Sequence, residues 1–239
     1  MEAKSPEEAR VFVYGLWKEH REEPSWKWFS YTPDSAGNTM RGSVYIGTLF
    51  APEQKSAVLS WSDGPGTVHI AVLHWIEEQW TAVFSAQQVP VEALPPSLQR
   101  PYIHFEDFNF DGWNDIRLMT DLREDGAHFD QLWLVNGSRF TAVPDFQSLT
   151  SPEADAKNRL IYTRSLGHCP DTPMRFGAWI LEETTLKNTK QVEVNCCGSG
   201  ELNCAITVDG SNKLPVPSSR VFLYVPEHFH TWMQKHLNK

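Results

Sequence analysis

The sequence predicts a mainly β protein, with antiparallel meander sheets in a propeller-like arrangement and one helix at each end. Short segments rich in β-branched and aromatic residues recur along the chain, and turn residues separate them. Apolar residues at helical spacing occur near the two ends. The strand groups recur loosely without a clean fixed period, as the sheets of a propeller-like or sandwich fold do.

The first part of the chain is predicted to be a helix followed by strands. Ser5, Pro6 and Glu8 form a capping box with proline at the first helical position. Strands are expected at 42–50, 56–61, 68–73 and 80–84. Because residues 90–101 are rich in proline, we place a domain boundary there. The predicted domains are 1–98, a helix plus a β region, and 99–239, a second β domain.

The second predicted domain continues as strands up to a C-terminal helix. Asn136-Gly137 is a tight-turn signal between two of these strands. Pro226 opens the helix, which carries Phe229 and Met233 on one face. The expected strands are 102–105, 116–120, 129–135, 140–143, 160–165, 179–183, 191–195, 205–208 and 221–225.

Residues 107–115 form a D-x-N-x-D-G-x-x-D run, which is typical of a calcium-binding loop. Ca²⁺ is a hard cation that takes six to eight oxygen ligands, and Gly112 permits the sharp turn around it. The expected metal ligands are the side chains of Asp107, Asn109, Asp111 and Asp115 and the carbonyl of Trp113. An EF-hand would need Glu at position 118, which is Leu, so the loop is expected to join two strands. The alternative is an acidic turn with Asx-type capping.

The charge of the chain argues for a protein partner. The formal net charge is −9, which excludes nucleic acid and anionic membranes as favoured partners and is compatible with a cationic protein. Between His104 and Asp130 there are eight Asp or Glu residues and two Arg residues.

All four cysteines lie in the last third of the chain. Cys204 is separated by a short Gly-Ser-Gly turn from Cys196 and Cys197, so one of that pair is expected to bond Cys204 and the other to reach Cys169. Two disulfides would imply an oxidising compartment, whereas four free thiols would suit a cytosolic protein. No stretch has the length of a transmembrane span, and we expect that a native signal peptide was removed ahead of Met1.

The sequence shows no G-x-S-x-G, H-E-x-x-H, P-loop or dinucleotide fingerprint. The densest acidic cluster is explained by calcium rather than by glycoside hydrolysis. A binding protein is therefore expected rather than an enzyme.

The segment from His104 to Cys169 resembles a known family. The resemblance rests on the F-x-D-F-N-F-D-G-W-N-D-I core, on Leu132 to Gly137, and on the strand and loop from Leu160 to Cys169. These features are similar to those of periplasmic calcium-binding inhibitors that act as immunity proteins against antibacterial peptidoglycan hydrolases. Type IV or type VI secretion systems of Gram-negative bacteria deliver such effectors.

The resemblance implies a periplasmic protein that occludes the active site of a cognate lysozyme-like or amidase toxin. The loop Arg159–His168 carries residue types suited to meeting a catalytic carboxylate, and we expect at least one of four residues to contact the effector: Tyr162, Arg164, Ser165 and His168. Ordinary strand and loop chemistry is the alternative for each. The alternative function is a calcium-dependent surface adhesion or carbohydrate-binding module.

Overall fold

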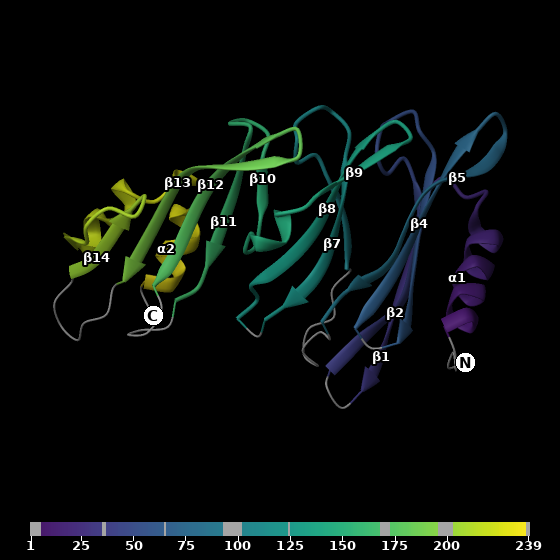
Figure 1. The fold of residues 1–239 in the computed structure, drawn as a ribbon, viewed down its shortest axis with the longest axis horizontal. Helices are drawn as coiled ribbons and strands as arrows, with labels where there is room; N and C mark the ends of the chain where they lie inside the picture. Colours follow the sequence, from purple (N-terminus) through teal and green to yellow (C-terminus); the bar gives the residue numbers. More distant parts are fainter. Residues whose placement is uncertain are drawn as a thin grey trace. The chain divides into compact units, whose positions relative to one another are not determined.

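The computed structural model describes residues 6–34, 37–64, 66–92, 102–123, 125–167, 173–195 and 203–237 (Figure 1). The chain forms two compact units, Met1–Gln147 and Ser148–Lys239. The boundary predicted at 98/99 therefore falls inside the first unit. Each unit is described by itself below.

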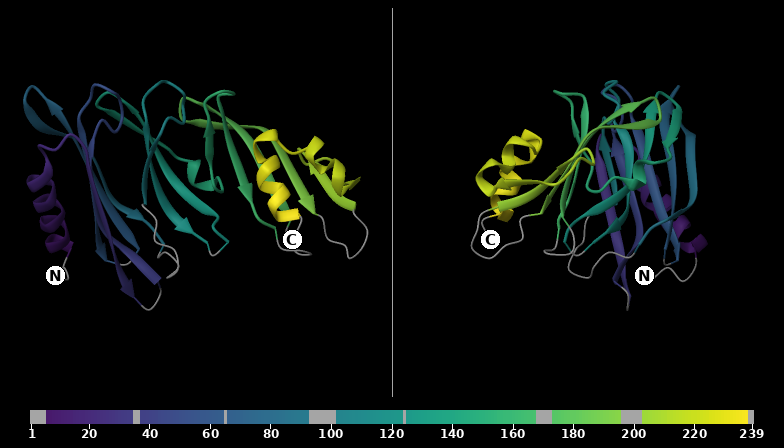
Figure 2. Two further views of the ribbon diagram at one scale, coloured as in Figure 1. Left: turned by 180° about the vertical axis from the view of Figure 1, so that it is seen from behind. Right: turned by 60° about the vertical axis from the view of Figure 1, so that its left-hand side comes forward.

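The first unit begins with a helix, α1, that covers one face of a five-stranded antiparallel meander (Figures 1 and 2). Ala9, Val13 and Trp17 recur at a spacing of four residues and are buried on that face. Acidic residues stand in the first turn of the helix and basic residues in the last, as the helix dipole favours. The elements are α1 (Pro6–His20), β1 (Trp26–Asp34), β2 (Gly37–Gly47), β3 (Ser56–Gly64), β4 (Thr67–Ile76) and β5 (Gln79–Pro90).

A four-stranded antiparallel meander follows in the same unit. Its last two strands are joined at the predicted Asn136-Gly137 turn, where Gly137 has a φ of 60°. The elements are β6 (Ile103–Glu106), β7 (Asp115–Leu122), β8 (His128–Asn136), β9 (Arg139–Val143) and the 3-10 helix η1 (Phe146–Ser148).

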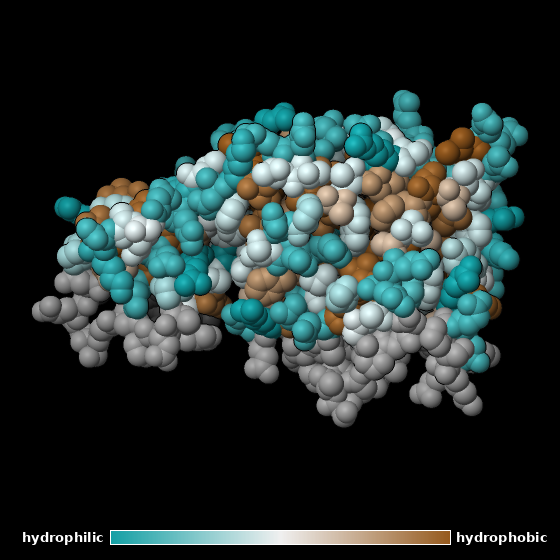
Figure 3. Space-filling view, in the orientation of Figure 1, coloured by the Kyte–Doolittle hydropathy of each residue, from teal (hydrophilic) through white to brown (hydrophobic). Residues whose placement is uncertain are grey.

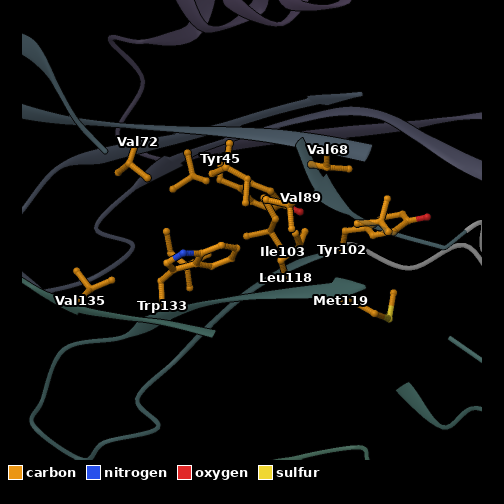
Figure 4. Close-up of a cluster of buried hydrophobic side chains, with 14 of the residues drawn as sticks. Tyr45, Val68, Val72, Val89, Tyr102, Ile103, Leu118, Met119, Trp133 and Val135 are labelled. Carbon is orange, nitrogen blue, oxygen red and sulfur yellow. The ribbon is translucent and has the colours of Figure 1, made fainter. Parts of the chain in front are cut away.

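One hydrophobic core joins these two sheets (Figure 4). Tyr45, Val58 and Val72 come from the five-stranded sheet, and Leu118 and Trp133 come from the four-stranded sheet. This shared core contains residues from both sides of position 98, so the two sheets pack together within one unit. A division there would expose a large apolar surface, which disfavours it as a domain boundary.

The second unit is a six-stranded antiparallel meander followed by short helices. Its core includes Phe176, Val192 and Ile206 from the sheet and Phe229 and Met233 from the C-terminal helices. The elements are β10 (Glu153–Asp155), β11 (Leu160–Ser165), β12 (Met174–Glu182), β13 (Thr185–Asn195), β14 (Asn203–Val208), β15 (Leu214–Pro217), η2 (Ser218–Leu223), η3 (Glu227–Phe229) and α2 (His230–Leu237).

The strand predicted at 221–225 is wrong, because residues Ser218–Leu223 form the 3-10 helix η2. Val221 and Val225 are both buried, and the Val225 N–H donates to the Val221 carbonyl at 3.4 Å. Leu223, midway between them, is 77% exposed, whereas a strand would place it on the same face as Val221 and Val225, so the burial pattern fits a helical turn.

The mainly β class, the antiparallel meanders and the helix near each end are confirmed, whereas a propeller-like arrangement is not shown. On the face drawn in Figure 3, hydrophilic residues cover much of the described surface, with hydrophobic residues in scattered patches. Among the residues that the structure describes, no helix is long and apolar enough to cross a membrane.

Candidate functional site

The predicted acidic loop connects β6 to β7 at one end of the four-stranded sheet. The two strands pair in antiparallel register, with Glu106 opposite Asp115, so residues 107–114 form the connection. Gly112 has a φ of 92° and Phe110 a φ of 59°. A Cβ atom at Gly112 would have no neighbour within 4 Å, so a larger side chain would fit there. Glycine is favoured instead because of the positive φ of its backbone.

The polar side chains of the loop hold its backbone through Asx-type hydrogen bonds. The Asp107 carboxylate accepts from the N–H groups of Asp111 and Gly112 at 3.1 and 2.9 Å. The Asp111 carboxylate accepts from the Trp113 N–H and from the Asn109 side-chain amide, both at 2.9 Å. These bonds fix the loop in one turn while Asp111 stays exposed.

Asp115 is buried and fastens the loop to the sheet. Its side chain has 0% exposure, and its two oxygens accept from the Phe108 N–H at 2.8 Å and the Val135 N–H at 2.9 Å. Burial raises the pKa of Asp115 to about 7, and the nearby charges of Asp107 and Asp111 also raise it, against the lowering effect of the two hydrogen bonds.

Two further residues anchor the loop in the first unit. Asn114 donates from its side-chain amide to the Leu49 carbonyl at 3.0 Å and from its backbone N–H to the Phe50 carbonyl at 2.8 Å. Phe108 is fully buried and packs edge-on against Phe146, with ring centroids 5.1 Å apart. The loop is therefore held both by the four-stranded sheet and by the connection between β2 and β3.

The donor set of this loop suits a hard cation in its chemistry, because carboxylate and amide oxygens are the ligands that Ca²⁺ prefers. The charges of Asp107 and Asp111 disfavour ionisation of Asp115, and a bound cation would relieve this effect. In the described part of the chain, however, no three His, Cys, Asp or Glu side chains are grouped to hold a metal ion. Both oxygens of Asp115 accept hydrogen bonds from backbone N–H groups, and these bonds do not decide whether the oxygens also serve as ligands, so calcium binding stays a prediction.

The four residues predicted to contact an effector belong to the second unit. Tyr162 is 7% exposed in β11 and stacks on His228 with ring centroids 4.6 Å apart. Ser165 is half-buried at the end of the same strand. His168 lies outside the described residues. The low exposure of Tyr162 is best explained by a place in the core of this unit.

Arg164 takes part in a charged cluster that the sequence did not predict. Its guanidinium pairs with one oxygen of Glu153, and the other oxygen of Glu153 lies 2.7 Å from Nε2 of His228. The guanidinium also lies 5.4 Å from the centre of the Trp232 ring. Arg164 therefore has internal partners, and its contact with an effector stays a prediction.

Cys204 is buried at 2% exposure in β14 and is disulfide-bonded. The other three cysteines, Cys169, Cys196 and Cys197, lie outside the described residues. The connectivity of the cysteines therefore stays a prediction.

Sequence reasoning missed Asn114 and Glu153 as anchoring residues. Nothing local marks either one, because Asn114 meets a segment 65 residues earlier and Glu153 meets a histidine 75 residues later. The buried role of Asp115 had one signal, since it directly precedes the alternating apolar residues of β7.

No protein-family model matches the sequence, and no curated protein matches it. A solved structure described as a Xanthomonas type IV secretion system related protein is similar to the chain at 12% sequence identity and a TM-score of 0.43. The match covers 80% of this chain and 99% of that one. A similarity this low supports no conclusion about function.

Proposed function

We propose that this chain is a periplasmic immunity protein that binds a cell-wall-degrading toxin, either lysozyme-like or an amidase, and inhibits it by occluding its active site. The chain acts by binding and performs no catalysis of its own. The resemblance of residues 104–169 to calcium-binding inhibitors of peptidoglycan hydrolases supports this proposal.

The observation that carries the proposal is the rigid mounting of an acidic loop on the four-stranded sheet. Asp111 is exposed, while Asp115 beneath it is fixed by two buried hydrogen bonds. A surface that is already ordered loses little conformational entropy when a partner binds. Negative charge on such a surface attracts a basic partner and raises the rate of association.

Calcium in the loop is part of the same proposal. The turn would supply ligand oxygens from Asp107, Asn109, Asp111 and the Trp113 carbonyl. Asp115 would coordinate the ion through a carboxylate lone pair that its two hydrogen bonds leave free. The ion would offset the repulsion among the three carboxylates and stabilise the loop conformation.

The test mixes the purified chain with a lysozyme-like or amidase effector domain and follows peptidoglycan hydrolysis and complex formation together. Asp111→Lys should slow association and weaken its dependence on salt, because it reverses charge on the proposed contact surface. Asp125→Lys is the matched control, since it makes the same charge change in the β7–β8 turn at the opposite end of the sheet. Equal effects of the two variants would show that only net charge matters, which would contradict a specific role for the loop.

A further inference from the structure

A cavity of about 370 Å³ lies in the first unit beside α1. This volume is at the lower end of the range for small-molecule sites. Helix α1 supplies one wall, strands β3 and β4 supply the floor, and β5 supplies the opposite rim. The lining residues are Glu7, Arg10, Tyr14, Trp61, His69, Ala71, Ser85 and Gln87.

Helix α1 approaches β2 closely beside the cavity. A Cβ at Gly42 of β2 would lie 2.7 Å from a methyl carbon of Val13 and 2.9 Å from the Ser60 carbonyl oxygen. The glycine therefore lets the helix settle closely over β2 and β3. Ser85 and Gln87 of β5 remain exposed on the uncovered part of the sheet.

Three rings form a continuous aromatic wall in the cavity. Trp61 and His69 are paired across β3 and β4, and their rings are parallel within 5° with centroids 5.5 Å apart. Tyr14 from α1 meets Trp61 at 5.9 Å with an angle of 60° between the rings. Such a wall provides apolar area with little loss of side-chain entropy on binding.

The charged residues of the cavity offset each other. The Arg10 guanidinium lies 3.6 Å from the Glu7 carboxylate. Ser85 and Gln87 bear no charge, and in the described part of the chain neither side chain has a hydrogen-bond partner. The site therefore favours a neutral ligand that has both hydroxyl groups and a face suited to aromatic rings.

We propose that this cavity binds a neutral saccharide. The face of a sugar ring would pack on the aromatic wall, and its hydroxyl groups would reach Ser85, Gln87 and the Glu7–Arg10 pair. An anionic or cationic ligand would have to compete with that ion pair, and a purely apolar ligand would leave the polar rim without partners. The site is separate from the acidic loop and does not rest on effector inhibition.

The experiment uses the full chain and titrates it with N-acetylglucosamine trimer and with cellotriose in a calorimeter. Trp61→Ala removes part of the wall, and Gln87→Ala removes a rim contact from an exposed position. Gln79→Ala is the matched control, because Gln79 is exposed at the other end of β5 and does not line the cavity. Circular dichroism reports whether each variant folds.

Binding of either saccharide, weakened at least about fivefold by Gln87→Ala as expected for one lost hydrogen bond, and unchanged by Gln79→Ala, supports the proposal. Failure of both saccharides to bind the wild-type chain overturns it. Binding that Gln87→Ala weakens by less than this, or that Gln79→Ala weakens equally, also overturns it. The Gln87 result decides the question even if Trp61→Ala fails to fold.

Discussion

Removal of the Asp115 carboxylate is expected to destabilise the first unit strongly. In Asp115→Ala, the Phe108 and Val135 N–H groups lose their acceptors, and the position is closed to water in the native structure. An unsatisfied buried donor costs roughly 1–3 kcal/mol, so two of them cost roughly 2–6 kcal/mol. The variant also relieves the burial of a charge, which offsets part of this loss. We therefore expect the free energy of unfolding to fall by about 2–4 kcal/mol.

The assay is urea denaturation at pH 8 with chelator present, followed by tryptophan fluorescence. Eight of the ten tryptophans belong to the first unit, so the signal reports mainly on that unit. Asp125→Ala is the control, because its carboxylate caps the Ala127 N–H at 2.9 Å in an exposed turn where water can replace it. A loss below about 0.5 kcal/mol for Asp115→Ala, the size of an ordinary surface substitution, would refute the reasoning.

Three further predictions concern the same unit. Because calcium bound to the folded state would stabilise it, a chelator should lower the melting temperature of the wild type, and Asp107→Ala should abolish that shift. A wild-type melting temperature that the chelator leaves unchanged would argue against calcium binding. Without calcium, the raised pKa of Asp115 stabilises the folded state most below pH 3.8, its ordinary pKa, and this stabilisation is lost as pH rises through about 7. Asp115→Asn should therefore flatten the dependence of the free energy of unfolding on pH over that range, as measured by urea titrations. His74 has the opposite effect. Burial lowers its pKa, so the stability that the neutral ring gives is present above pH 6.5 and is lost as pH falls through the lowered value. His74→Phe should remove this acid sensitivity in urea titrations, and an acid sensitivity equal to that of the wild type would argue against a role for this ring.

The calcium-type loop and most strands could be predicted from the sequence because their signals are local. The spacing of oxygen-bearing residues and Gly112 marked the loop, and alternating apolar residues marked the strands around it. The direction of the Asp115 side chain could not be predicted. It depends on the Val135 N–H, which reaches the loop only because β8 pairs with β7.

The domain boundary was misplaced for a related reason. Prolines at 90–101 favoured a boundary there, but local composition does not report which sheet faces pack together. Tyr45 and Trp133 share one core although 88 positions separate them in the sequence. Likewise, local sequence does not report that Arg164 pairs with Glu153, because the register of β10 and β11 brings these two residues together.

The most direct test of the proposed function is the inhibition of a peptidoglycan-hydrolase effector by the purified chain. For an immunity protein of this kind, activity should fall linearly with added chain and reach zero at a fixed molar ratio, while a complex of both proteins elutes together from a sizing column. Full hydrolytic activity in the presence of excess chain, with no complex for any lysozyme-like or amidase effector tested, would contradict it.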